Sequence, residues 1–558
     1  PSRAVQYERA GRKGMTDIFC PMYMGYEGCI KYCEDATMTK PLIQCEYAHA
    51  MGNSQGGFKE YWDLVRKYPK FQGGFIWDFV DQSIRSTGRN GKMIYAYGGD
   101  FNKFDASDIN FCNNGLISPD RVPNPHAYEV RHFYQDIWTT PADLANGEIN
   151  IRNEYFFRDL SAYCLEWEVL KNGKLVRRGR IDNLNVQPQQ TAKIKLDLGE
   201  TNQPGEWLLN VAYLLKANEG LLPAGHVIAK EQLTLQPYTA PSMELKNHET
   251  NNVETIAPDV QDNDRSYLIV SNNNFRIEFN KKNGYLTKYE VNGLDLMEEG
   301  SILKPNFWRA PTDNDFGAKL NHKYIAWKNP EIRLTSFKHQ LENKQVIVKA
   351  SYTMPGVSAK LNLTYIINNI GAISVTQKMT TDKNAKVSNM FRFGMQMQMP
   401  CSFETIEFYG RGPIENYIDR NHCTDLGIYR QQVAEQFYSY IRPQENGTKS
   451  DIRWWKMMNR AGDGIEIQAG TPFSASALNY TIESLDEGLY KKQMHSPEIE
   501  KADLVNLYID KIQAGLGCVN SWGAIARPEY QVPYKDYEFT FMLTPIQHHY
   551  CLLYTSDA

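Results

Sequence analysis

The side chains with the clearest chemical potential gather within residues 41–81. Glu46 closes a short apolar run, and His49 and Asn53 follow it. Trp77 lies in a second apolar run. A glutamate alone at a strand end is more often an ordinary charged terminus. An acid, hydrogen-bonding groups and a flat ring together suit a sugar, because polar groups bind its hydroxyls, an aromatic face packs against its C–H groups, and a carboxylate can react at the anomeric carbon.

The elements that must position these residues are a strand, a helix and a second strand. Leu42, Ile43 and Cys45 form a short apolar run that stops at Glu46. Apolar and aromatic residues then recur at helical spacing over residues 58–68, and Asn53 or Ser54 could cap this helix. Residues 75–77 predict the next strand. This order is typical of a β/α barrel, in which reactive side chains lie at the carboxyl ends of the strands.

Two further segments extend this pattern toward the N-terminus. Residues 4–7 and residues 16–23 both have the composition of short strands. Together with residues 41–48 and 73–80, they give four predicted strands, whereas a closed barrel of this type needs eight. The sequence therefore predicts an incomplete barrel over residues 1–136.

The rest of the chain has the period-two pattern of antiparallel strands. Over residues 137–238, short alternating strands and an Asn172-Gly173 hairpin signal predict an immunoglobulin-like β-sandwich. Residues 239–264 are polar and predict a linker. Strands return over residues 265–546, a region that is too long for an ordinary single sandwich. Residues 547–558 match no element, and we interpret them as a non-native tail.

Composition excludes several classes of protein. The chain has 558 residues, is 42% hydrophobic and has a net charge of −4 without a charged block. A nucleic-acid-binding protein would usually show a basic face, and a membrane span would need about 18 or more consecutive apolar residues, so we expect neither partner. Ten cysteines are scattered along the chain, and the closest pair, Cys29 and Cys33, has no companion pair. This spacing predicts neither a disulfide framework nor a zinc site.

A series of long motifs occurs in order along the chain. They are TDIFCPMY, CEYAHAMGNS, GGFIWDFVDQS, YGGDF, INFCNNGL, FWRAPTDNDFG, YGRGPIENYIDR and GLGCVNSWG. This set resembles the bacterial lactose-cleaving β-galactosidases of glycoside hydrolase family 2. The resemblance implies a multidomain α/β plus all-β chain: the C-terminal half of a (β/α)8 TIM barrel, an immunoglobulin-like β-sandwich, and a large C-terminal β-sandwich of the β-galactosidase small-chain type. It also implies that the chain is a C-terminal fragment.

The resemblance implies roles for individual side chains. Glu46 corresponds to the nucleophile of a retaining hydrolysis through a covalent galactosyl-enzyme, and Tyr23 to a tyrosine that contacts this nucleophile. The substrate-binding positions implied are Met22, His49, Trp77, Asp108, Asn114 and Trp522. Trp522 corresponds to an aromatic residue that stacks on the glucose half of lactose. Ordinary packing remains an alternative for Met22, His49 and Trp522.

Metal ions are also implied by the resemblance. A sodium ion would bind the backbone oxygen of Phe111 and the side chain of Asn114, which agrees with the preference of hard cations for oxygen. A third side-chain ligand would come from a part that this chain does not contain. Magnesium is expected in the complete enzyme, with its ligands likewise absent from this chain.

The second catalytic carboxylate is the main omission that we expect. In the family the acid/base glutamate follows an asparagine at the end of an earlier barrel strand. The two Asn-Glu pairs of this chain, Asn153-Glu154 and Asn218-Glu219, both lie in the predicted sandwich. We therefore expect a chain that carries the nucleophile, lacks the acid/base and is inactive alone.

Three hypotheses remain open. The first is a β-galactosidase fragment acting on lactose and other β-galactosides. The second is another glycosidase of the family, a β-glucuronidase or β-mannosidase, although these generally lack the large C-terminal domain. The third is a non-catalytic carbohydrate-binding fragment. For the complete enzyme we expect a homo-oligomer, a tetramer or a dimer, located in the cytoplasm rather than the periplasm.

Overall fold

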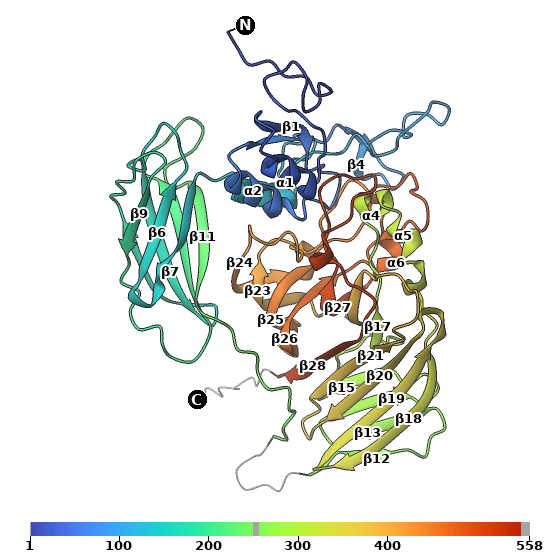
Figure 1. Ribbon diagram of the computed structural model, residues 1–558. Helices are drawn as coiled ribbons and strands as arrows, with labels where there is room; N and C mark the ends of the chain where they lie inside the picture. The colour runs from blue at the N-terminus through green and yellow to red at the C-terminus, as the bar shows by residue number, and fades with distance from the viewer. Residues whose placement is uncertain (1, 249–255, 548–558) are drawn as a thin grey trace.

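The structure is a computed structural model that describes residues 2–248 and 256–547 (Figure 1). The N-terminal part combines helices with short strands. Its elements are α1 (Tyr26–Glu34), β1 (Leu42–Tyr47), α2 (Phe58–Lys67), β2 (Phe71–Ile76), β3 (Ile84–Thr87), β4 (Met93–Ala96) and α3 (Pro125–Phe133). None of the helices in the described ranges is both long and apolar enough to cross a membrane.

The predicted strand–helix–strand unit is confirmed. β1 and β2 pair in parallel, and α2 connects them in the sequence. The apolar side of α2 includes Phe58 and Tyr61, which are buried in a core shared with Tyr47 of β1. Residues 16–23 pair with the β1 segment through two isolated parallel bridges. This segment therefore runs beside β1 without becoming a regular strand.

Two of the sequence-based predictions for this part are wrong. Residues 4–7 form no strand, and they are exposed. Val5 makes two hydrogen bonds with Asp17: its backbone oxygen accepts from the Asp17 N–H, and its own N–H donates to the Asp17 carboxylate. A strand needs a neighbouring backbone along its length, and a single contact point does not provide one. Neither Asn53 nor Ser54 caps α2, because the N-cap is Gly57, which adopts a left-handed conformation.

The second part is a sandwich of two antiparallel sheets. One sheet has the order β11-β10-β7-β8 and the other β5-β6-β9. Its elements are β5 (Ile137–Asp143), η1 (Leu144–Asn146), β6 (Glu148–Asn153), β7 (Tyr163–Lys171), β8 (Lys174–Ile181), β9 (Thr191–Lys195), β10 (Trp207–Leu215) and β11 (Val227–Gln236). The predicted hairpin joins β7 to β8: Asn172 and Gly173 both have positive φ, as a two-residue turn of this type requires.

The third part contains two sheets, of five and twelve strands. The smaller sheet comprises β12 (Asp259–Gln261), β13 (Tyr267–Ser271), β14 (Phe275–Asn280), β15 (Leu286–Val291) and β16 (Leu294–Asp295). The larger sheet comprises β17 (Lys304–Asn306), β18 (Arg333–Glu342), β19 (Gln345–Met354), β20 (Ala359–Ile367), β21 (Ile373–Thr381), β22 (Arg392–Pro400), β23 (Thr405–Gly412), β24 (Asp425–Gln432), β25 (Lys449–Met458), β26 (Gly464–Leu478), β27 (Leu504–Gln513) and β28 (Tyr537–Ile546). Short helices connect these strands: α4 (Asp313–Gly317), α5 (Leu320–Lys323), η2 (Ile325–Trp327), η3 (Pro355–Val357), η4 (Val433–Glu435), α6 (Ile482–Leu485), η5 (Ser496–Glu498) and η6 (Pro528–Tyr530).

One continuous core joins the two sheets of this third part. It runs from Leu268 to Leu543 and contains the buried faces of both sheets. The predicted linker is partly wrong, because β12 begins within it and pairs with β13. Residues 249–255 of that linker and residues 548–558 of the predicted tail lie outside the described residues.

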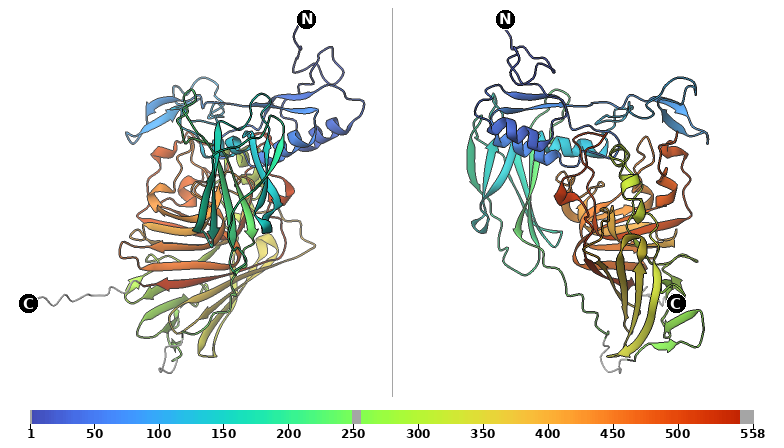
Figure 2. Two further views of the ribbon diagram at one scale, coloured as in Figure 1. Left: turned by 90° about the vertical axis from the view of Figure 1, so that its left-hand side faces the viewer. Right: turned by 45° about the vertical axis from the view of Figure 1, so that its right-hand side comes forward.

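The three parts are in contact with one another. In Figures 1 and 2 the N-terminal part, drawn in blue, covers one end of the large C-terminal sandwich, and the smaller sandwich lies alongside. Leu170 and Leu208 of the smaller sandwich pack against Tyr409 and Leu426 of the large one. This arrangement brings loops of the C-terminal part next to the carboxyl ends of β1 and β2.

Candidate functional site

Glu46 and Tyr23 form the centre of the candidate site. Glu46 is half-buried near the end of β1, and its backbone oxygen accepts a hydrogen bond of 2.8 Å from the Tyr23 N–H. The two side chains also interact: burial raises the pKa of the Tyr23 phenol well above its ordinary value, and hydrogen bonding to the Glu46 carboxylate adds to this shift. Tyr23 therefore stays protonated at neutral pH and acts as a donor toward Glu46.

Aromatic rings from two distant segments surround this pair, together with the nearby His49 ring. Trp522, from the loop between β27 and β28, lies with its ring centroid 4.6 Å from that of Tyr23 and 5.1 Å from that of His49. Phe111 is 5.3 Å from His49 by the same measure. The indole of Trp522 remains 48% exposed, so part of its surface is open to a ligand. The structure thus brings Tyr23, His49, Phe111 and Trp522 together.

Ser521 and Asn314 fix the orientation of the His49 ring. His49 Nδ1 lies 2.7 Å from Ser521 Oγ, and Ser521 donates to Asn314 Oδ1 at 2.6 Å. The Asn314 amide cannot turn around, since its Nδ2 donates to two backbone oxygens of the C-terminal part. Ser521 has only one proton to give, so His49 Nδ1 must be the donor to Ser521.

This proton arrangement leaves His49 Nε2 as an acceptor. Burial lowers the pKa of His49 to about 4, so the ring is neutral at physiological pH. A neutral ring with its proton on Nδ1 presents an unprotonated Nε2, which can accept a hydrogen bond from a sugar hydroxyl. Sequence reasoning singled out His49 but missed Ser521 and Asn314, although Ser521 stands immediately before Trp522 in the chain.

Trp77 lies at the end of β2, beside the loop that follows β1. Its N–H donates to the backbone oxygen of Tyr47, and its own backbone oxygen accepts from the N–H of Ala50. These two bonds fix the Trp77 backbone against the end of β1 and the loop that follows it, while Trp77 remains 40% exposed. The next residue, Asp78, donates its N–H to the backbone oxygen of Asn114, which places the Asn114 loop next to β2.

The two predicted sodium ligands are adjacent. Asn114 is buried, and its Nδ2 donates to the backbone oxygen of Phe111 at 2.8 Å. Its Oδ1 is buried without a hydrogen-bond partner among the described residues. A buried oxygen without a donor fits a hard cation, because such an ion prefers oxygen ligands and would satisfy this atom.

Met22 and Asp108 are placed less centrally. Met22 forms a backbone bridge with Glu46, and the residue is 42% exposed. Asp108 is exposed, and its backbone oxygen accepts from the Phe111 N–H. Its carboxylate makes no hydrogen bond or ion pair with any residue in the described ranges.

Asn53 connects the candidate site to the C-terminal part. Its Nδ2 donates to the Tyr417 hydroxyl and to the backbone oxygen of Glu445. Its Oδ1 accepts from Arg420, which also donates to the backbone oxygen of Ser54 at 2.7 Å. Sequence reasoning treated Asn53 as a hydrogen-bonding group near the sugar or a helix cap; the structure instead shows it anchoring the loop after β1.

Comparison with known proteins gives three matches along the chain. The models that match are the TIM barrel domain of the family 2 glycosyl hydrolases over residues 1–139, domain 4 of β-galactosidase over residues 149–236, and the β-galactosidase small chain over residues 271–543. Together they leave residues 140–148, 237–270 and 544–558 unmatched.

Curated proteins match over most of the chain. It is 33% identical over 516 residues to the β-galactosidase of Priestia megaterium, an alignment that covers 91% of this chain and 48% of that protein. It is 31% identical over 580 residues to the β-galactosidase of Pseudoalteromonas haloplanktis, covering 98% and 54% respectively. The chain therefore spans about half the length of these relatives.

Proposed function

Because the chain belongs to glycosyl hydrolase family 2, we propose that it supplies the nucleophile and part of the sugar pocket of a retaining β-galactosidase. The observation that carries this proposal is the position of Glu46: it lies near the carboxyl end of a barrel strand and receives a hydrogen bond from Tyr23, whose ring packs against the Trp522 indole. A protein that only binds a sugar does not need a nucleophile at the anomeric carbon.

In the first step a Glu46 carboxylate oxygen forms a bond to the anomeric carbon of a terminal β-D-galactosyl residue, and the glycosidic C–O bond breaks. The departing oxygen takes a proton from a second carboxyl group, about 5–5.5 Å from the nucleophile in retaining enzymes, which we assign to a part of the protein outside this chain. In the second step water attacks the same carbon, gives its proton to that carboxylate, and releases Glu46.

The other residues of the site position the sugar and the nucleophile. The Tyr23 phenol donates to Glu46 and stabilises its charge as the carboxylate leaves in the second step. His49 Nε2 accepts from a sugar hydroxyl. Asn114 and the Phe111 backbone oxygen would hold a sodium ion, which supplies a positive charge for binding sugar oxygens.

Hydrolysis of nitrophenyl glycosides by the complete protein tests the proposed function. We expect the β-galactoside to be cleaved at least about 10²-fold faster, by kcat/KM, than the β-glucuronide or β-mannoside, because a pocket built to bind a particular set of hydroxyls rejects other patterns. The 558-residue chain alone should be slower than the complete protein by at least about 10²-fold, the contribution of general acid–base catalysis. Preference for glucuronide or mannoside would support another family activity, and binding without hydrolysis would support a carbohydrate-binding fragment.

The two exposed indoles should differ in the half of the substrate that they bind. In the complete protein, Trp77→Ala is expected to weaken galactose inhibition by about tenfold, and Trp522→Ala to weaken glucose as an acceptor by a similar factor. Inhibition constants and transfer to glucose measure the two effects. Phe157→Ala, an exposed ring in the loop between β6 and β7, is the control and should change neither. Equal losses for both sugars in both tryptophan variants would contradict the assignment.

A further inference from the structure

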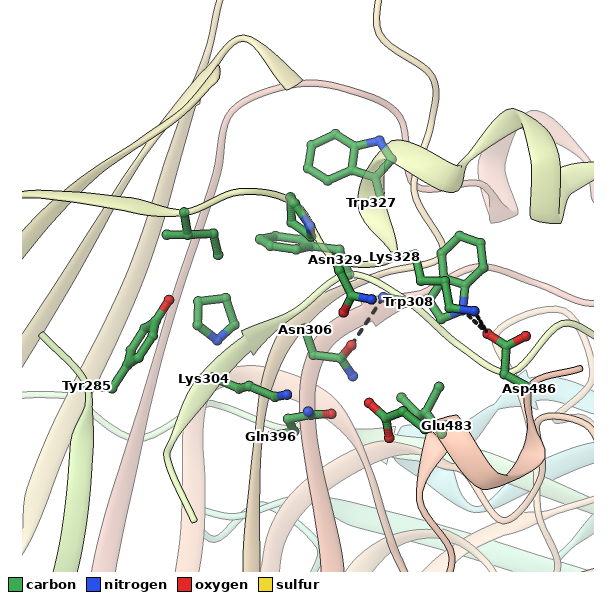
Figure 3. A pocket seen from close by; sticks show the side chains of 15 residues that line it. Tyr285, Lys304, Asn306, Trp308, Trp327, Lys328, Asn329, Gln396, Glu483 and Asp486 are labelled. Carbon is green, nitrogen blue, oxygen red and sulfur yellow. Dashed lines mark hydrogen bonds and ion pairs between the residues drawn. The ribbon is translucent and has the colours of Figure 1, made fainter. Parts of the chain in front are cut away.

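A second pocket lies in the large C-terminal sandwich, away from the residues discussed so far (Figure 3). It has a volume of about 270 Å³ and opens between β17, β22, η2 and α6. None of its lining residues belongs to the group around Glu46. Its volume lies just below the range of about 300–1,000 Å³ for drug-sized ligands, so it suits a ligand the size of a simple sugar.

Asn306 gives this pocket an unused hydrogen-bond donor. The residue is only 6% exposed, and its Oδ1 accepts the backbone N–H of Trp308 at 3.2 Å. That bond fixes the amide, so its Nδ2 is the remaining polar atom, and it has no partner among the described residues. In Figure 3 this nitrogen points toward the side of the pocket where Glu483 lies. A buried donor without an acceptor is costly, and a ligand oxygen would satisfy it.

Further polar groups line the same space without being used. Lys304 and Gln396 are direct partners across the β17–β22 pair, so their side chains lie on one face. Within the described ranges, neither side chain makes a hydrogen bond or ion pair, and the same holds for the carboxylate of Glu483. The pocket thus offers an ammonium group, an amide and a carboxylate, a mixture of donors and acceptors.

The opposite wall is rigid and neutral in charge. Asp486 accepts from the Trp308 Nε1 at 2.8 Å and pairs with Lys328 at 2.8 Å. This pairing neutralises Lys328 and locks the Trp308 indole. The two charges left over, on Lys304 and Glu483, are opposite in sign, so a neutral ligand is favoured over an anion such as phosphate.

Aromatic surface completes the pocket. Tyr285 and Trp308 both line the pocket; Tyr285 is half-buried, whereas Trp308 is only 3% exposed and presents little of its ring. Apolar ring surface combined with several donors and acceptors matches the C–H groups and hydroxyls of a pyranose. We propose that this pocket binds a neutral mono- or disaccharide, independently of the hydrolytic site.

Binding to the full 558-residue chain tests this proposal. Glu46→Gln is used as the background so that lactose is not consumed, and D-galactose, D-glucose, lactose and inorganic phosphate are titrated by calorimetry. At least one of the saccharides should bind. Combining Lys304→Met with Gln396→Leu should weaken that binding by at least about tenfold, because hydrogen bonds from a charged and an amide group are lost. Trp522→Ala should leave unchanged the part of the binding that these two pocket substitutions remove.

Asn306→Asp provides an independent variant, since it keeps the size of the side chain and replaces the Nδ2 donor with an acceptor. It should also weaken saccharide binding, and thermal unfolding of each variant verifies that the fold is retained. The proposal is overturned if no saccharide binds, if only phosphate binds, or if Trp522→Ala removes binding while the pocket variants do not. Because binding is measured without turnover, its failure would leave the proposed hydrolysis unaffected, and the reverse is also true.

Discussion

Replacing Glu46 with glutamine is expected to lower kcat of the complete protein toward a β-galactoside by a factor on the order of 10⁴–10⁶, the range for loss of a residue that acts covalently. The amide is nearly the same size as the carboxylate but is a poor nucleophile toward the anomeric carbon. The fold should be retained, because the Glu46 backbone keeps its bridge to Met22 and its hydrogen bond from the Tyr23 N–H. Steady-state kinetics and thermal unfolding measure the two effects.

A 2-fluoro-galactoside should identify the nucleophile directly. The fluorine slows the second step, so the covalent intermediate accumulates and peptide mapping should find the sugar on Glu46. The acidic residues at the end of the neighbouring strand provide the comparison: burial raises the pKa of both Asp78 and Asp81, the latter to about 7. An adduct on either aspartate, or unchanged kcat in Glu46→Gln, would rule out the assignment.

Arg420→Met is expected to destabilise the protein by about 3–5 kcal/mol, the cost of removing one partner of a buried ion pair. Arg420 is fully buried and pairs with Glu415 at 2.9 Å. Without it the buried carboxylate of Glu415 keeps, within the described part of the chain, hydrogen bonds from Tyr440 and Gly447 alone. The loop after β1 also loses its bonds from Arg420 to Asn53 and Ser54, so we expect galactose affinity to fall in the same variant.

Chemical denaturation of the Arg420 variants measures this effect. Arg430→Met is the control, because Arg430 is 66% exposed and lies 3.9 Å from Glu407, a surface pair worth no more than about 1 kcal/mol. Adding Glu415→Leu to Arg420→Met should recover part of the stability, since no unpaired charge then remains. If the Arg420 and Arg430 substitutions lowered the free energy of unfolding equally, the buried ion pair would stabilise the protein no more than a surface pair does.

Local sequence patterns were sufficient to predict the elements that are stabilised by residues close together in the chain. Apolar periodicity predicted β1, α2 and β2, and the Asn172-Gly173 pair predicted the turn between β7 and β8. Each of these features depends on side chains a few residues apart, so the sequence contains the information directly. The same reasoning failed at residues 4–7, where a suitable composition has no neighbouring strand to pair with.

The candidate site shows the opposite dependence. Its proposed nucleophile, its histidine and its two tryptophans were predicted from motifs, but their environment comes from residues far away in the chain. Ser521 orients His49 across 472 positions, and Arg420 anchors Asn53 across 367. Hydrogen bonds of this range require the C-terminal sandwich to pack against the barrel strands, and no local pattern encodes that packing. The sequence by itself determined which side chains could react, and the tertiary structure decided the proton on His49 and the anchor of the loop after β1.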